Sequence, residues 1–120
     1  MNTIHHVHWN QQECEALVKP MRQAGRDARI ESEGGVWAYT QITEDPPDAL
    51  AISLARLPSH GRQTALAVRQ RIPLEALPIF LVDGDPARIE LVQEKLPGAQ
   101  FLPSEELVPT LAKIKDRVYP

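Results

Sequence analysis

Residues that could form a binding or catalytic site lie at or near the ends of three apolar runs. They are His8, Trp9, Ser53, Asp83 and Asp85. In a parallel α/β sheet, ligands bind outside the carboxyl ends of the strands, so we expect these residues to gather around one crevice. A serine, a histidine and an aspartate could form a hydrolytic triad. The sequence has no Gly-x-Ser-x-Gly nucleophile elbow, however, and strand ends bring polar residues together in any such fold. The hydrolase hypothesis is therefore not favoured.

The first apolar run contains three histidines, His5, His6 and His8. Neutral imidazoles suit zinc better than magnesium, which raises the hypothesis of a transition-metal site. Side chains alternate along a strand, so His6 and His8 lie on one face and His5 on the other, and the run alone cannot supply three convergent ligands. A site of His8, Asp83 and His60 stays open as an alternative. Otherwise His6 is expected to be a hydrogen-bonded core histidine.

The composition is that of an ordinary globular protein. The chain has 120 residues, 42% of them hydrophobic, and 13 basic against 16 acidic residues give a formal net charge of −3. This length predicts one domain over residues 1–120, and the acidic balance argues against nucleic acid as a partner. The lone Cys14 cannot form an internal disulfide, and neither a membrane-spanning run nor a signal peptide is present. We expect a cytoplasmic protein without a membrane partner.

Five short apolar runs alternate with segments of helical period, a pattern typical of a parallel sheet with right-handed crossovers and helices on both faces. The predicted strands span residues 3–9, 27–32, 48–54, 79–82 and 99–102. The first predicted helix follows the first strand and ends near residue 25. The other four predicted helices span residue 34 to just before residue 46, and residues 62–71, 86–96 and 104–118.

Local signals predict several helix boundaries. Asp85 is expected to be an N-cap with Pro86 as the first helical residue, and Ser104 is expected to cap the last helix. Pro20 should kink the first helix. Residues 57–61 are expected to form a loop. Trp37 and Tyr39 on the second helix could form an exposed contact patch or pack in the core.

The third strand and its loop carry a family resemblance. Pro47-Asp48, then the apolar run containing Ser53, then Leu57-Pro58 and Gly61 closely resemble the third strand and following loop of response-regulator receiver (CheY-like) domains. Residues 78–82 are similar to the fourth receiver strand, and residues 96–99 to the lead into the fifth. The resemblance implies a three-layer, doubly wound flavodoxin-like fold with strand order 2-1-3-4-5 and about five helices. Val7, Ile52 and Leu81 should be buried in its central strands.

The chemical positions of the receiver family are not matched. Receivers hold Mg²⁺ with two acidic residues after the first strand and a phospho-accepting Asp, and the resemblance places these positions on His8, Trp9 and Ser53. At the position of the receiver Thr or Ser after the fourth strand, this chain has Asp83, which would repel a phosphate. The Lys that receivers carry at the end of the fifth strand has no counterpart, since no Lys occurs between Lys95 and Lys113. The chain therefore resembles a degenerate, stand-alone pseudo-receiver. We expect a vacated pocket, filled by the Trp9 ring and cross-linked by His8 and Asp83, with no catalytic residue, cofactor or metal.

The resemblance implies a non-catalytic, phosphorylation-independent signalling or interaction module that acts through a protein partner in trans or as a homodimer. In receivers the usual partner surface corresponds to the region from Pro86 to Val118. The alternative is a small-molecule or metal-binding protein, with or without enzymatic activity, that uses the crevice at His8, Trp9, Ser53 and Asp83.

Overall fold

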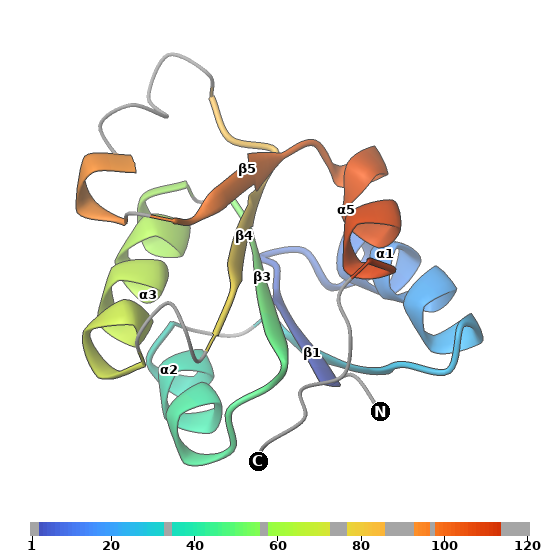
Figure 1. The fold of residues 1–120 in the computed structure, drawn as a ribbon, viewed down its shortest axis with the longest axis horizontal. Coiled ribbons are helices and arrows are strands. Elements are labelled where there is room, and N and C mark those ends of the chain that lie inside the picture. The colour runs from blue at the N-terminus through green and yellow to red at the C-terminus, as the bar shows by residue number, and fades with distance from the viewer. Residues whose placement is uncertain are drawn as a thin grey trace.

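The computed structural model describes residues 3–32, 35–55, 58–72, 77–85, 93–96 and 98–113, with the side chains of residues 35–37 and 58–59 left out. Its five strands form one parallel sheet in the order β2-β1-β3-β4-β5, with helices on both faces (Figure 1). The strands are β1 (Thr3–Val7), β2 (Asp27–Glu31), β3 (Ala49–Ser53), β4 (Ile79–Val82) and β5 (Gln100–Leu102). The predicted doubly wound sheet and its strand order are confirmed.

The central strands are buried along their whole length. Every residue of β3 and β4 is buried, which explains why both read as continuous apolar runs in the sequence. Val7, Ile52 and Leu81 are fully inaccessible to solvent, as predicted. β4 has the predicted bounds, and the other four strands are one or two residues shorter than predicted. β1 ends at Val7 and leaves His8 and Trp9 beyond its carboxyl end.

The helices divide between the two faces of the sheet (Figure 1). One face carries α1 (Gln11–Gln23) and α5 (Ser104–Leu111), and the other carries α2 (Gly35–Glu44) and α3 (Pro58–Arg71). Residues 93–95 are also helical. The helix start predicted at Pro86 and the last turns predicted up to residue 118 lie outside the described residues.

The core consists of two apolar clusters separated by the sheet. The cluster under α1 and α5 includes Ile4, Cys14 and Phe80, and the cluster under α2 and α3 includes Val7 and Leu81. Successive residues of each strand therefore point to opposite clusters, as the period of two requires. This alternation decides which polar residues at the strand ends face the same helices.

The start of α3 differs from the prediction. Residues 57–61 were expected to form a loop, but the helix already begins at Pro58. Proline fits the first helical position because its fixed φ is helical and its missing N–H has no partner to lose there. Gly61 then passes close to the end of β3, where a Cβ atom would lie 2.9 Å from the carbonyl oxygen of Ser53. Helix α3 is thus held against the carboxyl end of the sheet.

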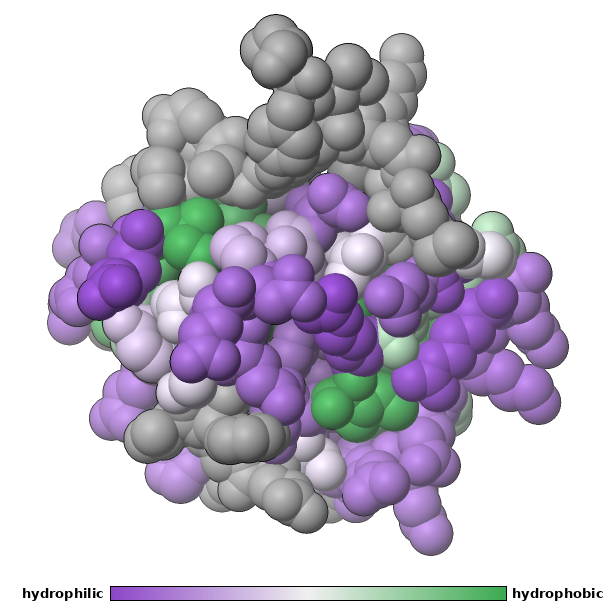
Figure 2. Space-filling model, turned by 90° about the horizontal axis from the view of Figure 1, so that it is seen from below, coloured by the Kyte–Doolittle hydropathy of each residue, from purple (hydrophilic) through white to green (hydrophobic). Residues whose placement is uncertain are grey.

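The surface at the bottom of Figure 1 is mostly hydrophilic, with apolar residues in separate patches among polar ones (Figure 2). Among the described helices, none is long and apolar enough to cross a membrane.

Candidate functional site

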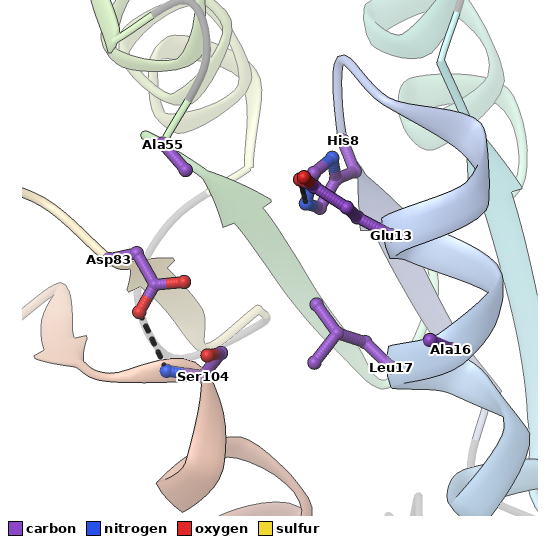
Figure 3. Close-up of a pocket in the computed structure, with 7 residues that line it drawn as sticks. All are labelled: His8, Glu13, Ala16, Leu17, Ala55, Asp83 and Ser104. Atoms are coloured by element: carbon purple, nitrogen blue, oxygen red, sulfur yellow. Dashed lines mark hydrogen bonds and ion pairs between the residues drawn. The ribbon is translucent and has the colours of Figure 1, made fainter.

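The carboxyl ends of β1, β3 and β4 surround an open pocket of about 600 Å³. Its described lining comes from the segment after β1, helix α1, the loops after β3 and β4 and the first residue of α5. The lining residues are His8, Glu13, Ala16, Leu17, Ala55, Asp83 and Ser104 (Figure 3). This is the edge of the sheet at which parallel α/β folds bind ligands.

One side of the pocket is formed by His8 and Glu13. His8 is only 3% exposed, and its Nδ1 accepts a hydrogen bond from the backbone N–H of Asn10 at 3.0 Å. In the neutral ring the proton therefore resides on Nε2. Nε2 lies 3.5 Å from Oε2 of Glu13, whose side chain is 43% exposed. The imidazole is thus held in one orientation and directed at a carboxylate on the pocket rim.

The opposite side is formed by Asp83 and Ser104 (Figure 3). Asp83 has a left-handed backbone with φ of 61°, a conformation that aspartate tolerates better than most residues. Its Oδ1 accepts a hydrogen bond from the backbone N–H of Ser104 at 2.8 Å, and its own N–H donates to the carbonyl of Leu102 at 3.1 Å. The β4 loop is therefore tied to β5 and to the start of α5.

The predicted cap of α5 was wrong. Ser104 was expected to cap this helix, but Ser104 is its first helical residue, and the N-cap, Pro103, makes no side-chain capping bond. The carboxylate of Asp83 satisfies one of the free N–H groups at the helix start instead. A negative charge at this position also interacts favourably with the helix dipole.

Of the five residues expected around the crevice, three, Trp9, Ser53 and Asp85, are not in the described pocket lining. Trp9 packs on the opposite side of the sheet, against the cluster under α2 and α3, where its ring meets His60 edge-on at 5.8 Å between centroids. Ser53 is 1% exposed, and its Oγ accepts a hydrogen bond from the N–H of Ala55 at 3.2 Å. His8 and Asp83 do line the pocket but lie on opposite sides of it, so the expected cross-link between them is not formed (Figure 3).

The histidines of β1 are arranged as the strand period predicts. The rings of His6 and His8 lie on the same face, 5.8 Å apart between centroids. His5 and His6 are buried, as predicted for His6, and a polar contact of the His6 ring with the backbone of Val7 only partly offsets the effect of burial on its pKa. Burial lowers the pKa of His5 to about 4, with Arg29 adding to the effect. Burial lowers the pKa of His6 to about 3, with His8 adding to it. Both rings are therefore neutral near pH 7.

The described residues contain no group of three His, Cys, Asp or Glu side chains placed to hold a metal ion. His60, named as a third ligand in the metal hypothesis, contacts Trp9 on the other face of the sheet. Of the two aromatic residues predicted to form either a contact patch or part of the core, Tyr39 is half-buried and packs against the cluster under α2 and α3. The side chain of Trp37 is not among those that the structure describes.

Glu13 and Leu17 were not predicted as pocket residues. The signal for Glu13 was present, because Asn10 followed three residues later by Glu13 is a helix-start pattern, and Asn10 Oδ1 does accept the N–H of Glu13 at 3.0 Å. That cap places Glu13 in the first turn of α1, next to the end of β1. Leu17 lies one turn after Glu13 on α1 and projects into the pocket (Figure 3).

Solved structures similar to this chain include response regulators and their receiver domains. The chemotaxis protein CheY4 of Vibrio cholerae superposes with a TM-score of 0.78 at 16% identity, over 96% of this chain and 99% of that one. A putative response regulator of Chloroflexus aurantiacus gives a TM-score of 0.74 at 25% identity, over 92% and 93% of the chains. The receiver domain of the putative response regulator NarL of Mycobacterium tuberculosis gives 0.71 at 21% identity, over 95% and 98%.

This chain has the receiver fold. No model of a protein family matches the sequence, and no curated protein matches it. Within the receiver fold, His8 and Trp9 follow β1, Ser53 ends β3 and Asp83 follows β4. The pocket described above lies at this carboxyl-terminal edge of the receiver sheet.

Proposed function

We propose that residues 1–120 form a single receiver-like domain that acts as a non-catalytic signalling or interaction module, independent of aspartyl phosphorylation. It acts through a protein partner in trans or through self-association. The receiver-fold similarity supports a signalling module, and the residues at the strand ends support the loss of phosphorylation.

One observation carries this proposal: the three positions at which the receiver resemblance places carboxylates hold His8, Trp9 and Ser53. Phosphoryl transfer needs a nucleophile and a cation that neutralises the developing charge. His8 offers an imidazole that is directed at Glu13, and Trp9 points to the other side of the sheet. Neither side chain replaces a hard oxygen ligand for Mg²⁺.

Ser53 is a poor substitute for the acceptor aspartate. Its hydroxyl is buried and accepts the N–H of Ala55, and Ser53 does not belong to the described pocket lining. Asp83 adds a carboxylate to the pocket, where a phosphoryl group would meet like charge. Together these features favour a site that a phosphoryl donor does not modify.

The partner surface that we propose is the region from residue 86 to 118. Its described part includes β5 and α5, whose start is tied to the β4 loop through Asp83 and Ser104. This bond favours one fixed arrangement of α5 relative to the sheet. The module is therefore proposed to present its surface without a covalent signal.

The test is incubation of the wild-type chain with acetyl phosphate and Mg²⁺, followed by intact mass measurement and an amide NMR spectrum. We expect no added phosphoryl group and no shifts around Ser53 and Asp83. Ser53→Asp alone should also stay unmodified, because the two other positions at which receivers hold the metal still carry His8 and Trp9. The combined variant with His8→Asp, Trp9→Asp and Ser53→Asp returns a carboxylate to all three positions and is the comparison in which metal binding and phosphoryl uptake are measured again. A mass increase of one phosphoryl group on the wild-type chain would overturn the proposal.

A further inference from the structure

We propose that the pocket at the carboxyl ends of β1, β3 and β4 is the docking site for a basic side chain, lysine or arginine, of a protein partner. The inference rests on the proposed function, since it names the chemistry of that partner. Three properties of the pocket support the inference: its size and shape, its apolar wall and its charge.

The pocket has the size and shape to receive a long side chain. Its volume of about 600 Å³ exceeds what a single metal ion occupies, and it is open to solvent, so a side chain projecting from another surface can enter. Ala16 and Leu17 from α1 and Ala55 after β3 supply apolar wall (Figure 3). Lysine and arginine bury their methylene stems against such surfaces while their charged ends reach polar groups.

The charged groups of the lining are acidic. Glu13 and Asp83 bring carboxylates to opposite sides of the pocket, and none of the described lining residues is a lysine or arginine. His8 is buried and holds its Nε2 toward the Glu13 carboxylate, which favours a fixed position for that acid. The exposed Glu105 and Glu106 follow Ser104 in the first turn of α5 and add negative charge beside the pocket. A cation is thus complementary to the pocket.

An anion does not fit the same arrangement. The backbone N–H of Ser104 at the start of α5 would be a natural anion donor, but the Asp83 carboxylate already occupies it at 2.8 Å. An incoming phosphate or carboxylate would face Asp83 and Glu13 without a compensating charge in the described lining.

A divalent metal is also a poorer match than a basic side chain. Mg²⁺ needs near-octahedral oxygen ligands, and no group of three ligating side chains is present among the described residues. An ammonium or guanidinium has several N–H donors and can satisfy two separated carboxylates without such convergence.

The experiment is an amide NMR titration of the ¹⁵N-labelled chain with N-acetyl-lysine amide and N-acetyl-arginine amide. We expect saturable shifts at the amides of Glu13, Leu17 and Ser104 with both compounds. N-acetyl-norleucine amide has a similar apolar stem without the charge and should produce none. Because one side chain buries little surface, we expect weak binding, in the millimolar range.

Charge-removing variants test the carboxylates. Glu13→Gln and Asp83→Asn should each weaken lysine-amide binding by about two- to fivefold, the range of exposed ion pairs. The Asn side chain can still accept the Ser104 N–H, so Asp83→Asn separates the charge from the cap of α5. Glu44→Gln removes an exposed acid at the end of α2 and is the matched control, which should bind like the wild type.

The inference would be overturned if neither basic compound produced shifts, or if the norleucine compound produced equal shifts. It would also be overturned if Mg²⁺ bound more tightly at the same amides. Tenfold tighter binding of free butylammonium would instead assign the pocket to a small amine, and this too would overturn the inference. If the basic compounds do not bind and the wild-type chain also takes up no phosphoryl group, only the basic side chain as occupant of the pocket is refuted. Phosphoryl uptake by the wild-type chain would instead refute the proposed function.

Discussion

The two buried histidines of β1 should make the stability of the protein strongly pH-dependent. His5 and His6 are 1% and 0% exposed, and burial is the largest influence on the pKa of both rings. A charged imidazole at either position would lose its hydration, and the Val7 backbone compensates this only in part at His6. The folded state therefore keeps both rings neutral, whereas the unfolded chain binds protons at the ordinary histidine pKa of about 6.5.

The sign and the size follow from the pKa values. Burial lowers the pKa of His5 to about 4 and that of His6 to about 3. Between pH 6.5 and these values the unfolded state binds more protons than the folded state, so stability rises with pH in this window and is lost as the pH falls. At pH 5 each ring costs about 2 kcal/mol relative to pH 7.5, or about 4 kcal/mol together. This is a large part of a typical stability of about 5–15 kcal/mol.

The assay is urea unfolding at pH 7.5 and pH 5.0, followed by far-UV circular dichroism. We expect the free energy of unfolding to fall by about 4 kcal/mol at the lower pH. His5→Leu and His6→Leu keep an apolar side chain of similar size, and each should remove about half of this difference. The double variant should be almost independent of pH in this range.

Equal free energies of unfolding at the two pH values would refute the argument. So would a pH dependence that persists unchanged in the double variant, because the protons would then be taken up elsewhere. A loss confined to one histidine would show that the other is solvated or paired in the folded state.

Three further predictions concern the strand ends and the core. Asp83→Ala should destabilise the fold by about 1 kcal/mol through loss of the α5 cap and should raise the amide exchange rate of Ser104, measured by hydrogen exchange. Unchanged exchange would contradict the capping role. Gly61→Ala should destabilise by about 1–3 kcal/mol in urea unfolding, because its Cβ would lie 2.9 Å from the Ser53 carbonyl oxygen; a stabilised variant would disprove this contact. Cys14 is buried and burial raises its pKa to about 12, so Ellman's reagent should label it only as fast as the chain opens. Rapid labelling at neutral pH would show that α1 does not cover it.

The strands were predictable because their signal is local. Residues 79–82 are a continuous apolar run and residues 48–54 are largely apolar, which is the pattern expected of a strand covered on both faces. The observed ends, at Val82 and Ser53, differ from the predictions by no more than one residue. The alternation that separates His5 from His6 and His8 was equally local, since it follows from the period of two.

The partners at the strand ends were not predictable in the same way. Asp83 caps a helix that starts 21 residues later in the sequence, and no local rule relates the two positions. The sequence instead offered Ser104, a good capping residue by type, at a position that the fold uses as the first residue of α5. Trp9 was placed in the pocket by the family resemblance, although the local alternation along the strand already puts it on the opposite side of the sheet from His8.

Composition and periodicity by themselves determined the strand-helix alternation and the parallel sheet, because burial on both faces leaves a readable apolar pattern. They also determined which residue types stand at the strand ends. Only the tertiary structure decided which of those residues share a pocket, since that depends on the side of the sheet each side chain faces and on the helix packed there. It brought His8 to Glu13 and Asp83 to Ser104, and it left Trp9 against His60.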